Sequence, residues 1–149
     1  MANNYRNIIS AKGLHSVWNG KDYNDIIPSV PEEYPNYVSE GDPTGMFGWR
    51  YKNWGCDGRL FFSDNSKENT LFLLTANATP WRVIKRISEL LGDTDLYHEF
   101  SDQDNYNHTI YYLNWRNGKV TNAEVARYDY DIDDYGENIV LDPDKIFSE

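Results

Sequence analysis

The chain has 149 residues, 24 of them acidic and 14 basic, and its formal net charge is -10 at pH 7. This length fits one domain with a sizeable core, and an aromatic content of 15% argues against a wholly disordered chain. A single cysteine excludes an intramolecular disulfide framework, and no apolar run approaches the length of about 18 residues that predicts a membrane span. The acidic balance argues against ordinary binding to a nucleic-acid backbone, which needs lysine and arginine.

The acidic side chains are concentrated in the second half of the chain. Residues 1–75 carry 9 acidic and 7 basic side chains, whereas residues 76–149 carry 15 acidic and 7 basic ones. No internal repeat is evident and no linker divides the halves, so we expect a single domain over residues 1–149. The excess charge therefore marks one part of that domain.

The N-terminal segment predicts one strand followed by an irregular stretch. Residues 5–11 centre on Ile8 and Ile9 and are typical of a strand. Three prolines within residues 28–35 remove backbone donors and favour an extended loop, and a turn-rich segment over residues 41–48 follows.

A hairpin is predicted next. Residues 59–63 and 70–75 are short and apolar, and a polar spacer separates them, which indicates two antiparallel strands. Residues 71–74 are continuously apolar, so we expect the second strand to be covered on both faces.

One amphipathic helix is predicted over residues 80–91. Thr79 suits the N-cap, and Pro80 suits the first helical position, where its missing N–H has no intrahelical partner in any case. Gly92 is a natural C-terminal stop. Five apolar side chains recur at the spacing of one helical face: Val83, Ile84, Ile87, Leu90 and Leu91.

The second half predicts further strands over residues 96–100, 109–115 and 123–132. Asn117-Gly118 is a hairpin-turn signal, and the final Asp-Pro-Asp stretch is typical of a loosely held tail. The predicted fold class is α+β: an antiparallel sheet with one main helix packed on it and extra C-terminal strands.

Several segments share an order and spacing with one known family. Residues 23–32 contain Tyr-Asn-x-Ile-Ile-Pro-x-x-Pro-Glu, residues 49–55 contain Trp-x-x-x-Asn-Trp-Gly, and Thr75-Ala76 precedes the Pro-initiated helix and an acidic strand over residues 96–102. Over residues 1–120 the chain thereby resembles the YubB-type ferredoxin-like domain of phages, plasmids and other mobile elements. Residues 121–149 form an acidic C-terminal extension to that core.

The resemblance implies a ferredoxin-like topology and a cytoplasmic location in the host cell. It implies no iron–sulfur cluster, because one cysteine could not ligate it. The chain departs from the family at Cys56-Asp57-Gly58-Arg59, where Thr-Lys-Trp-Asp is usual, and at Asn77, where the family has tryptophan. The family has no assigned reaction, so the resemblance supplies a context and not an activity.

The first candidate site is acidic and rich in tyrosine. Between residues 128 and 133 tyrosine or isoleucine alternates with aspartate, which on a strand would place rings on one face and carboxylates on the other. Such a face could occupy the basic surface of a host nucleic-acid-handling or defence protein, as a mimic of DNA; the competing interpretation is that acidity only keeps the protein soluble. The expected contact residues are Tyr128, Asp129, Tyr130, Asp131, Asp133, Asp134, Asp102 and Asp104.

An alternative function is a small-ligand-binding domain or an unrecognised enzyme with a pocket around the Asn-Trp-Gly signature. Its lining would include Trp49, Asn53, Trp54 and Arg59. The competing interpretation is that the two tryptophans anchor a loop onto the sheet, with Gly55 in a tight turn. A structural or oligomeric component is a third option.

The sequence predicts no catalytic residue, metal or cofactor. Asp129-x-Asp131-x-Asp133 starts like a calcium loop, but Asp134 and Val140 stand where an EF-hand needs glycine and glutamate. The three histidines lack metal-ligand spacing, and Cys56 lies beside an acidic residue that opposes thiolate formation. We therefore expect a non-enzymatic protein whose partner is a protein with a basic surface.

Overall fold

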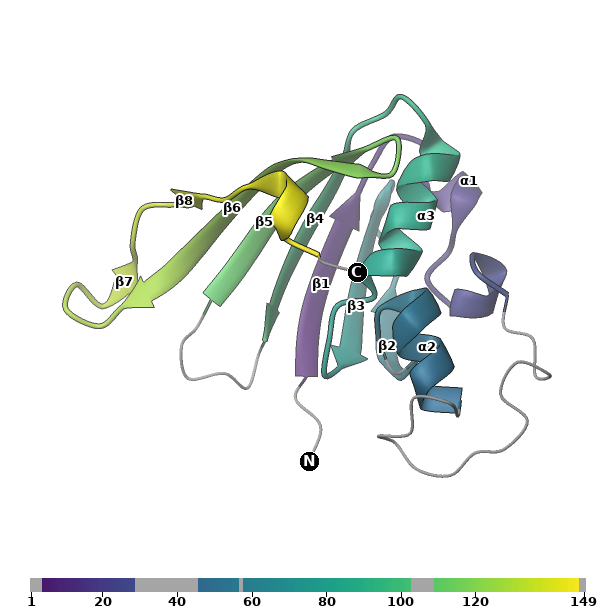
Figure 1. Ribbon diagram of the computed structural model, residues 1–149, viewed down its shortest axis with the longest axis horizontal. Helices are drawn as coiled ribbons and strands as arrows, with labels where there is room; N and C mark the ends of the chain where they lie inside the picture. Colours follow the sequence, from purple (N-terminus) through teal and green to yellow (C-terminus); the bar gives the residue numbers. More distant parts are fainter. Residues whose placement is uncertain (1–3, 29–45, 57, 103–108, 148–149) are drawn as a thin grey trace.

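A computed structural model describes residues 4–28, 46–56, 58–102 and 109–147; of residues 46–49 it describes the backbone only. Three α-helices and eight strands are present in these ranges (Figure 1). The helices are α1 (Leu14–Val17), α2 (Met46–Trp54) and α3 (Trp81–Leu91), with short 3-10 helices η1 (Tyr23–Asp25) and η3 (Pro143–Lys145). The strands are β1 (Asn4–Ser10), β2 (Leu60–Asp64), β3 (Thr70–Ala76), β4 (Leu96–Asp102), β5 (Thr109–Arg116), β6 (Lys119–Asp129), β7 (Asp134–Tyr135) and β8 (Ile139–Val140).

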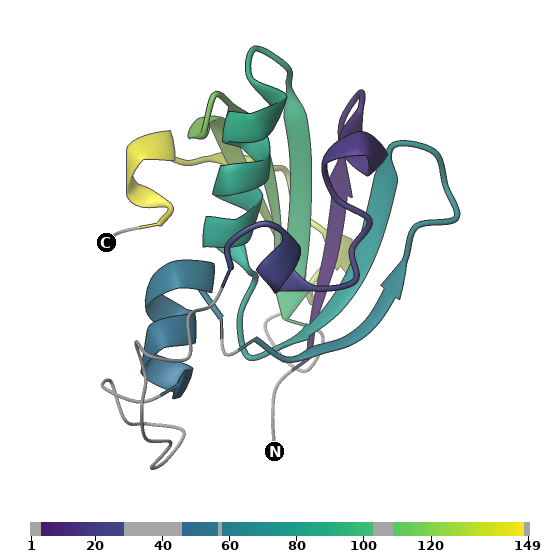
Figure 2. The same cartoon turned by 90° about the vertical axis from the view of Figure 1, so that its right-hand side faces the viewer.

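The strands form one antiparallel sheet in the order β2-β3-β1-β4-β5-β6-β7, and β8 also pairs with β6. The α-helices and η3 lie on one face of this sheet, which we call the inner face (Figures 1 and 2). In the part of the chain that the structure describes, no helix covers the opposite, outer face. The predicted α+β class with an antiparallel sheet is confirmed.

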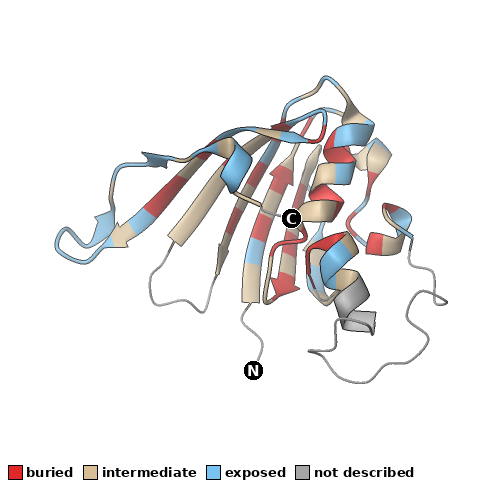
Figure 3. Ribbon diagram, in the orientation of Figure 1, coloured by how far each residue is buried: buried red, intermediate tan, exposed pale blue. Residues whose placement is uncertain are grey.

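The core lies between the inner face and α3 (Figure 3). Ile9, Leu71 and Leu113 from the sheet and Ile84 and Ile87 from α3 are almost completely buried. Each such side chain contributes roughly 1.5–3 kcal/mol through removal from water. The predicted helix is confirmed, and Gly92, at φ 70°, ends it as expected.

Two details of the predicted helix are wrong. Leu90 is 49% exposed, because the apolar face of α3 is narrower than the sequence pattern suggests. Pro80, not Thr79, occupies the N-cap position, and no side chain caps the helix there. The Thr79 hydroxyl is instead buried in a hydrogen-bonded chain that crosses the core.

That chain fixes the protonation of His98, which is fully buried. The Trp115 indole N–H donates to His98 Nδ1 at 3.1 Å, and since this indole is only a donor, the ring proton of His98 lies on Nε2. Nε2 then donates to Thr79 Oγ1 at 2.9 Å, and Thr79 donates to Asn7 Oδ1 at 2.7 Å. The Asn7 side-chain amide N–H donates to Thr75 Oγ1 at 3.0 Å, and the Thr75 hydroxyl donates to the Ala78 carbonyl. Burial lowers the pKa of His98 to about 3, so the ring is neutral.

The hairpin of β2 and β3 is confirmed, but the prediction that residues 71–74 are covered on both faces is wrong. Leu71 and Leu73 are fully buried, whereas Phe72 and Leu74 point to the outer face and are only half-buried. An antiparallel sheet with helices on one side leaves alternate side chains towards solvent.

The C-terminal third differs from expectation at both ends. The Asn117-Gly118 turn is confirmed, with φ of 51° and 75°, and β6 starts four residues earlier than predicted, at Lys119. The predicted loose tail is wrong, because η3 and its neighbours pack on the inner face. The ring of Phe147 stacks on Trp81 at 4.8 Å and also contacts Trp115, and the Leu141 N–H donates to the Ala123 carbonyl at 2.9 Å.

Candidate interaction surface

Residues 128–135 form a projecting hairpin made of the end of β6, a turn and β7 (Figure 1). We call it the tyrosine–aspartate hairpin. The prediction of a strand to residue 132 with alternating faces is wrong here, because β6 ends at Asp129 and residues 130–133 are a turn. Asp133 adopts a left-handed φ of 52°, and Asp129 Oδ1 accepts from the Asp131 N–H at 2.9 Å. Aspartate favours such turns because its short carboxylate bonds to nearby backbone N–H groups.

Three tyrosines order this hairpin. The ring of Tyr128 makes edge contacts with Tyr130 at 4.9 Å and with Tyr135 at 5.5 Å. The Tyr128 hydroxyl donates to the carboxylate of Asp133, and this bond raises the pKa of Tyr128 above its usual value, with Asp134 adding to the effect. These contacts give the hairpin a defined conformation.

The tip of the hairpin presents apolar and acidic groups together. Tyr130 is 66% exposed and Ile132 is 60% exposed, and the carboxylates of Asp129, Asp131 and Asp134 are exposed beside them. No ion pair neutralises these three carboxylates within the described residues. Exposed rings flanked by carboxylates suit a partner surface that combines apolar contacts with lysine or arginine.

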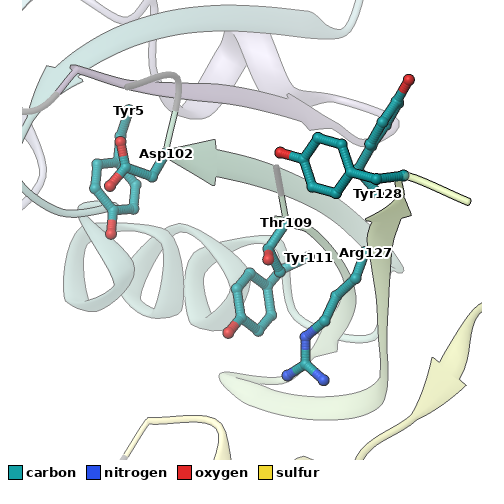
Figure 4. Close-up of a pocket in the computed structure, with 7 residues that line it drawn as sticks. Tyr5, Asp102, Thr109, Tyr111, Arg127 and Tyr128 are labelled. Carbon is teal, nitrogen blue, oxygen red and sulfur yellow. The ribbon is translucent and has the colours of Figure 1, made fainter. Parts of the chain in front are cut away.

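A hollow of about 510 Å³ adjoins the base of the hairpin at the ends of four neighbouring strands. Figure 4 shows Arg127 and Tyr128 leaving β6 in opposite directions, with Arg127 beside Tyr111. Burial, followed by the charge of Asp102, raises the pKa of Tyr5 above its usual value. The lining residues are Tyr5, Asp102, Thr109, Tyr111, Arg127, Tyr128 and Tyr130.

The structure thus brings three of the predicted contact residues together. Asp102, at the end of β4, lines the same hollow as Tyr128 and Tyr130, although 26 and 28 positions separate them in sequence. Asp104 lies outside the described residues. Sequence reasoning missed Tyr5, Tyr111 and Arg127, because only the strand order β1-β4-β5-β6 places them side by side.

The Asn-Trp-Gly signature belongs to the core. Trp54, at the end of α2, is 3% exposed; its indole N–H donates to the Ile27 carbonyl at 2.9 Å, and its ring packs on Tyr23. Gly55 has φ of 82°, and a Cβ there would lie 2.6 Å from the Trp81 ring. This burial favours the anchoring interpretation for Trp54.

The other residues of the predicted pocket around the Asn-Trp-Gly signature lie in different environments. Asn53 and Arg59 are half-buried, and the side chain of Trp49 lies outside the described residues. The segment predicted as turn-rich, residues 41–48, is helical from Met46, where α2 begins, and its earlier part is outside the described residues. The hollow beside the tyrosine–aspartate hairpin is lined by none of Asn53, Trp54 and Arg59.

No cluster of three or more His, Cys, Asp or Glu side chains suited to a metal occurs among the described residues. His15 bonds to the Thr70 carbonyl at 3.1 Å, His98 belongs to the core and Cys56 is buried. None of the helices described here has the length and apolar character needed to cross a bilayer.

Comparisons of the chain with protein-family models, with curated proteins and with solved structures find no match.

Proposed function

We propose that this chain is a non-enzymatic binding protein that contacts a basic surface of a protein partner through the tyrosine–aspartate hairpin. The observation that carries this proposal is the ordered, projecting hairpin with exposed Tyr130 and Ile132 among unneutralised carboxylates. Aromatic side chains supply contact area at low entropic cost, and the carboxylates speed association with a cationic surface and pair with its arginines.

The context we propose is a phage or plasmid protein acting in the cytoplasm of its host. The partner would be a host nucleic-acid-handling or defence protein, whose basic nucleic-acid channel the hairpin would occupy. The sequence resemblance to the YubB-type family supports the mobile-element origin, and the net charge of -10 supports a basic target.

A ferredoxin-like core is the topology we propose within residues 1–120, over β1 to β4. Its support is the element order β1, helices, β2, β3, α3, β4 and the spatial order β2-β3-β1-β4 with every neighbour antiparallel. Such a split βαβ arrangement is the ferredoxin-like pattern. Strands β5 to β8 would then be additions along the β4 edge, and they carry the hairpin.

The test is capture of partners from host lysate with tagged protein, identified by mass spectrometry with and without nuclease. The informative variant is D129N/D131N/D134N, which removes three charges and keeps an acceptor oxygen at each position for the turn. E68Q/E89Q/D144N is the matched control, with the same change in net charge elsewhere. A nuclease-resistant, salt-sensitive basic partner that is lost only with the hairpin variant supports the proposal. Equal capture by both variants refutes it.

A small-ligand site is the second candidate, favoured by the hollow in Figure 4. Asp102 and Arg127 bring opposite charges to a space of about 510 Å³ that Tyr5 and Tyr111 also line. Such a site suits a small dipolar ligand with a cationic and an anionic end. L-lysine and L-glutamate are suitable probes: a rise in melting temperature with either, lost in Arg127→Gln, supports the site, and no rise with both counts against it.

A further inference from the structure

The outer face of the sheet is unusually apolar for a surface that no described helix covers. The strand registers place two rows of side chains across it. One row runs Asp64, Phe72, Ile8, Glu99, Tyr112, Glu124 and Val140, and the next runs Phe62, Leu74, Arg6, Ser101, Ile110 and Ala126. Phe62 is 53% exposed and Val140 is 73% exposed. An antiparallel sheet with one solvated face normally shows polar residues there, so the apolar side chains within these two rows indicate an interaction site.

The middle of this face has a specific charge arrangement. Tyr112 on β5 lies directly between Glu99 on β4 and Glu124 on β6, and Ile110 lies one step along β5 between Ser101 and Ala126. Neighbouring strands are about 4.8 Å apart, so the two carboxylates flank the apolar line of β5 at a separation of about 10 Å. We call Glu99, Ile110, Tyr112 and Glu124 the outer-face strip; Ala126 beside them is only 3% exposed.

Both carboxylates of the strip lack a cationic partner. Glu99 accepts a hydrogen bond of 2.5 Å from the Tyr97 hydroxyl, and neither Glu99 nor Glu124 forms an ion pair with any described lysine or arginine. Both are half-buried. Negative charge held on an apolar surface favours a ligand that supplies cations together with apolar groups.

We propose that the outer-face strip binds an amphipathic helix of the protein partner, with an apolar stripe bordered on both sides by lysine or arginine. A helix has a diameter of about 10–12 Å, so one lying along β5 would bring its two flanks over Glu99 and Glu124. Its apolar stripe would cover the half-buried Ile110 and Tyr112. This inference rests on the proposed function, since it specifies which part of a basic partner is recognised.

Continuity with the tyrosine–aspartate hairpin supports this assignment. Tyr128 follows Ala126 on the outer face of β6, and it pairs with Tyr135 of β7 in the sheet register. A partner bound to the hairpin can therefore contact the outer-face strip at the same time. A second copy of this chain is a poorer occupant, because each copy has a net charge of -10 and Arg6 is the only basic side chain in the two rows.

The test uses a synthetic probe of 18 leucine and lysine residues arranged as one amphipathic helix, and a scrambled peptide of the same composition. Binding is measured by calorimetry, and the contact is located by amide chemical shifts. We expect the helical probe to bind, to shift β4, β5 and β6, and to weaken at raised salt, while the scrambled peptide binds at least about ten-fold more weakly.

Variants decide whether the strip itself is responsible. E99Q/E124Q should weaken binding of the probe by about five-fold, since two exposed pairs of about 0.5 kcal/mol each sum to about 1 kcal/mol, or about five-fold. E68Q/D144N is the control with the same charge change, at exposed positions outside the strip and the hairpin, and it should leave probe binding within about two-fold.

Equal binding of both peptides, equal effects of the two variants, or a concentration-dependent dimer that buries the strip would each overturn the inference. These outcomes are separate from the test of the proposed function. If the hairpin variant loses the host partner while E99Q/E124Q retains it, the inference fails and the proposed function stands.

Discussion

Protonation of His98 should couple the stability of this protein to pH in the mildly acidic range. Burial lowers the pKa of His98 in the folded protein to about 3, whereas an unfolded chain has a histidine pKa of about 6.5. Because the folded value is the lower one, the stabilisation is complete above pH of about 7 and decreases as the pH falls towards 3. Between pH 7.5 and 5 only the unfolded state takes up this proton, which lowers the free energy of unfolding by about 2 kcal/mol.

The hydrogen-bonded chain explains why the folded state resists protonation. A proton on His98 Nδ1 would face the Trp115 indole N–H, which is also a donor. The hydrogen bond of 3.1 Å between Trp115 and His98 would then be lost, because two donors would face each other. The charge would also be buried in a fully enclosed position.

The assay is urea unfolding at pH 7.5 and pH 5, followed by tryptophan fluorescence, for the natural chain and for His98→Gln. Glutamine can donate to Thr79 and accept from Trp115, and it does not titrate. The carboxylates contribute equally to both proteins, so the natural chain should lose about 2 kcal/mol more than the variant. Equal losses would refute the reasoning, as would an imidazole NMR signal of His98 that titrates near pH 6.5 in the folded protein.

Two further predictions concern packing, and both are read out as free energies of unfolding at pH 7.5. Phe147→Ala should cost about 2 kcal/mol, because its ring stacks on Trp81 and Trp115, whereas Ile132→Ala, at an exposed tip, should cost less than about 0.5 kcal/mol. Similar values for both would mean that the C-terminal segment is not part of the core. Gly55→Ala should cost about 2–4 kcal/mol, since a Cβ there lies 2.6 Å from Trp81 and φ is 82°. Gly92→Ala shares the positive φ but has open space, so a loss as large as at Gly55 would show that the steric contact is unimportant.

The tyrosine–aspartate hairpin and the outer-face strip divide the recognition of a partner into two parts. The hairpin is highly exposed, and Asp129, Asp131 and Asp134 form no ion pair with the described residues, which favours fast capture of a basic surface. The strip has half-buried apolar groups, which favour a slow release once they are covered. Variants in the hairpin should therefore affect the association rate and salt dependence, and variants in the strip the dissociation rate.

Local patterns in the sequence determined most of the secondary structure. The spacing of Val83, Ile84 and Ile87 predicts α3, the Asn117-Gly118 pair predicts the β5–β6 turn, and Gly92 ends the helix where expected. These features depend on backbone preferences and on a repeat of two or 3.6 residues, which neighbouring residues specify by themselves. The prediction failed where aspartates compete for the backbone, since the Asp129–Asp133 region forms a turn and not a strand.

Only the tertiary structure decided which residues share a surface. Asp102 meets Tyr128 in one hollow, and Glu99, Tyr112 and Glu124 form one row, because the strand order and registers align distant segments. Thr79 is a core residue and not the predicted helix cap, because its hydroxyl bonds to the buried Asn7. Phe147 packs against the core and does not belong to a loose tail, because its ring stacks on Trp81. The concentration of negative charge in residues 76–149 is a property of the sequence, but its division between a projecting hairpin and a flat apolar face follows from long-range strand pairing. That pairing depends on hydrophobic burial against α3, which no local pattern encodes.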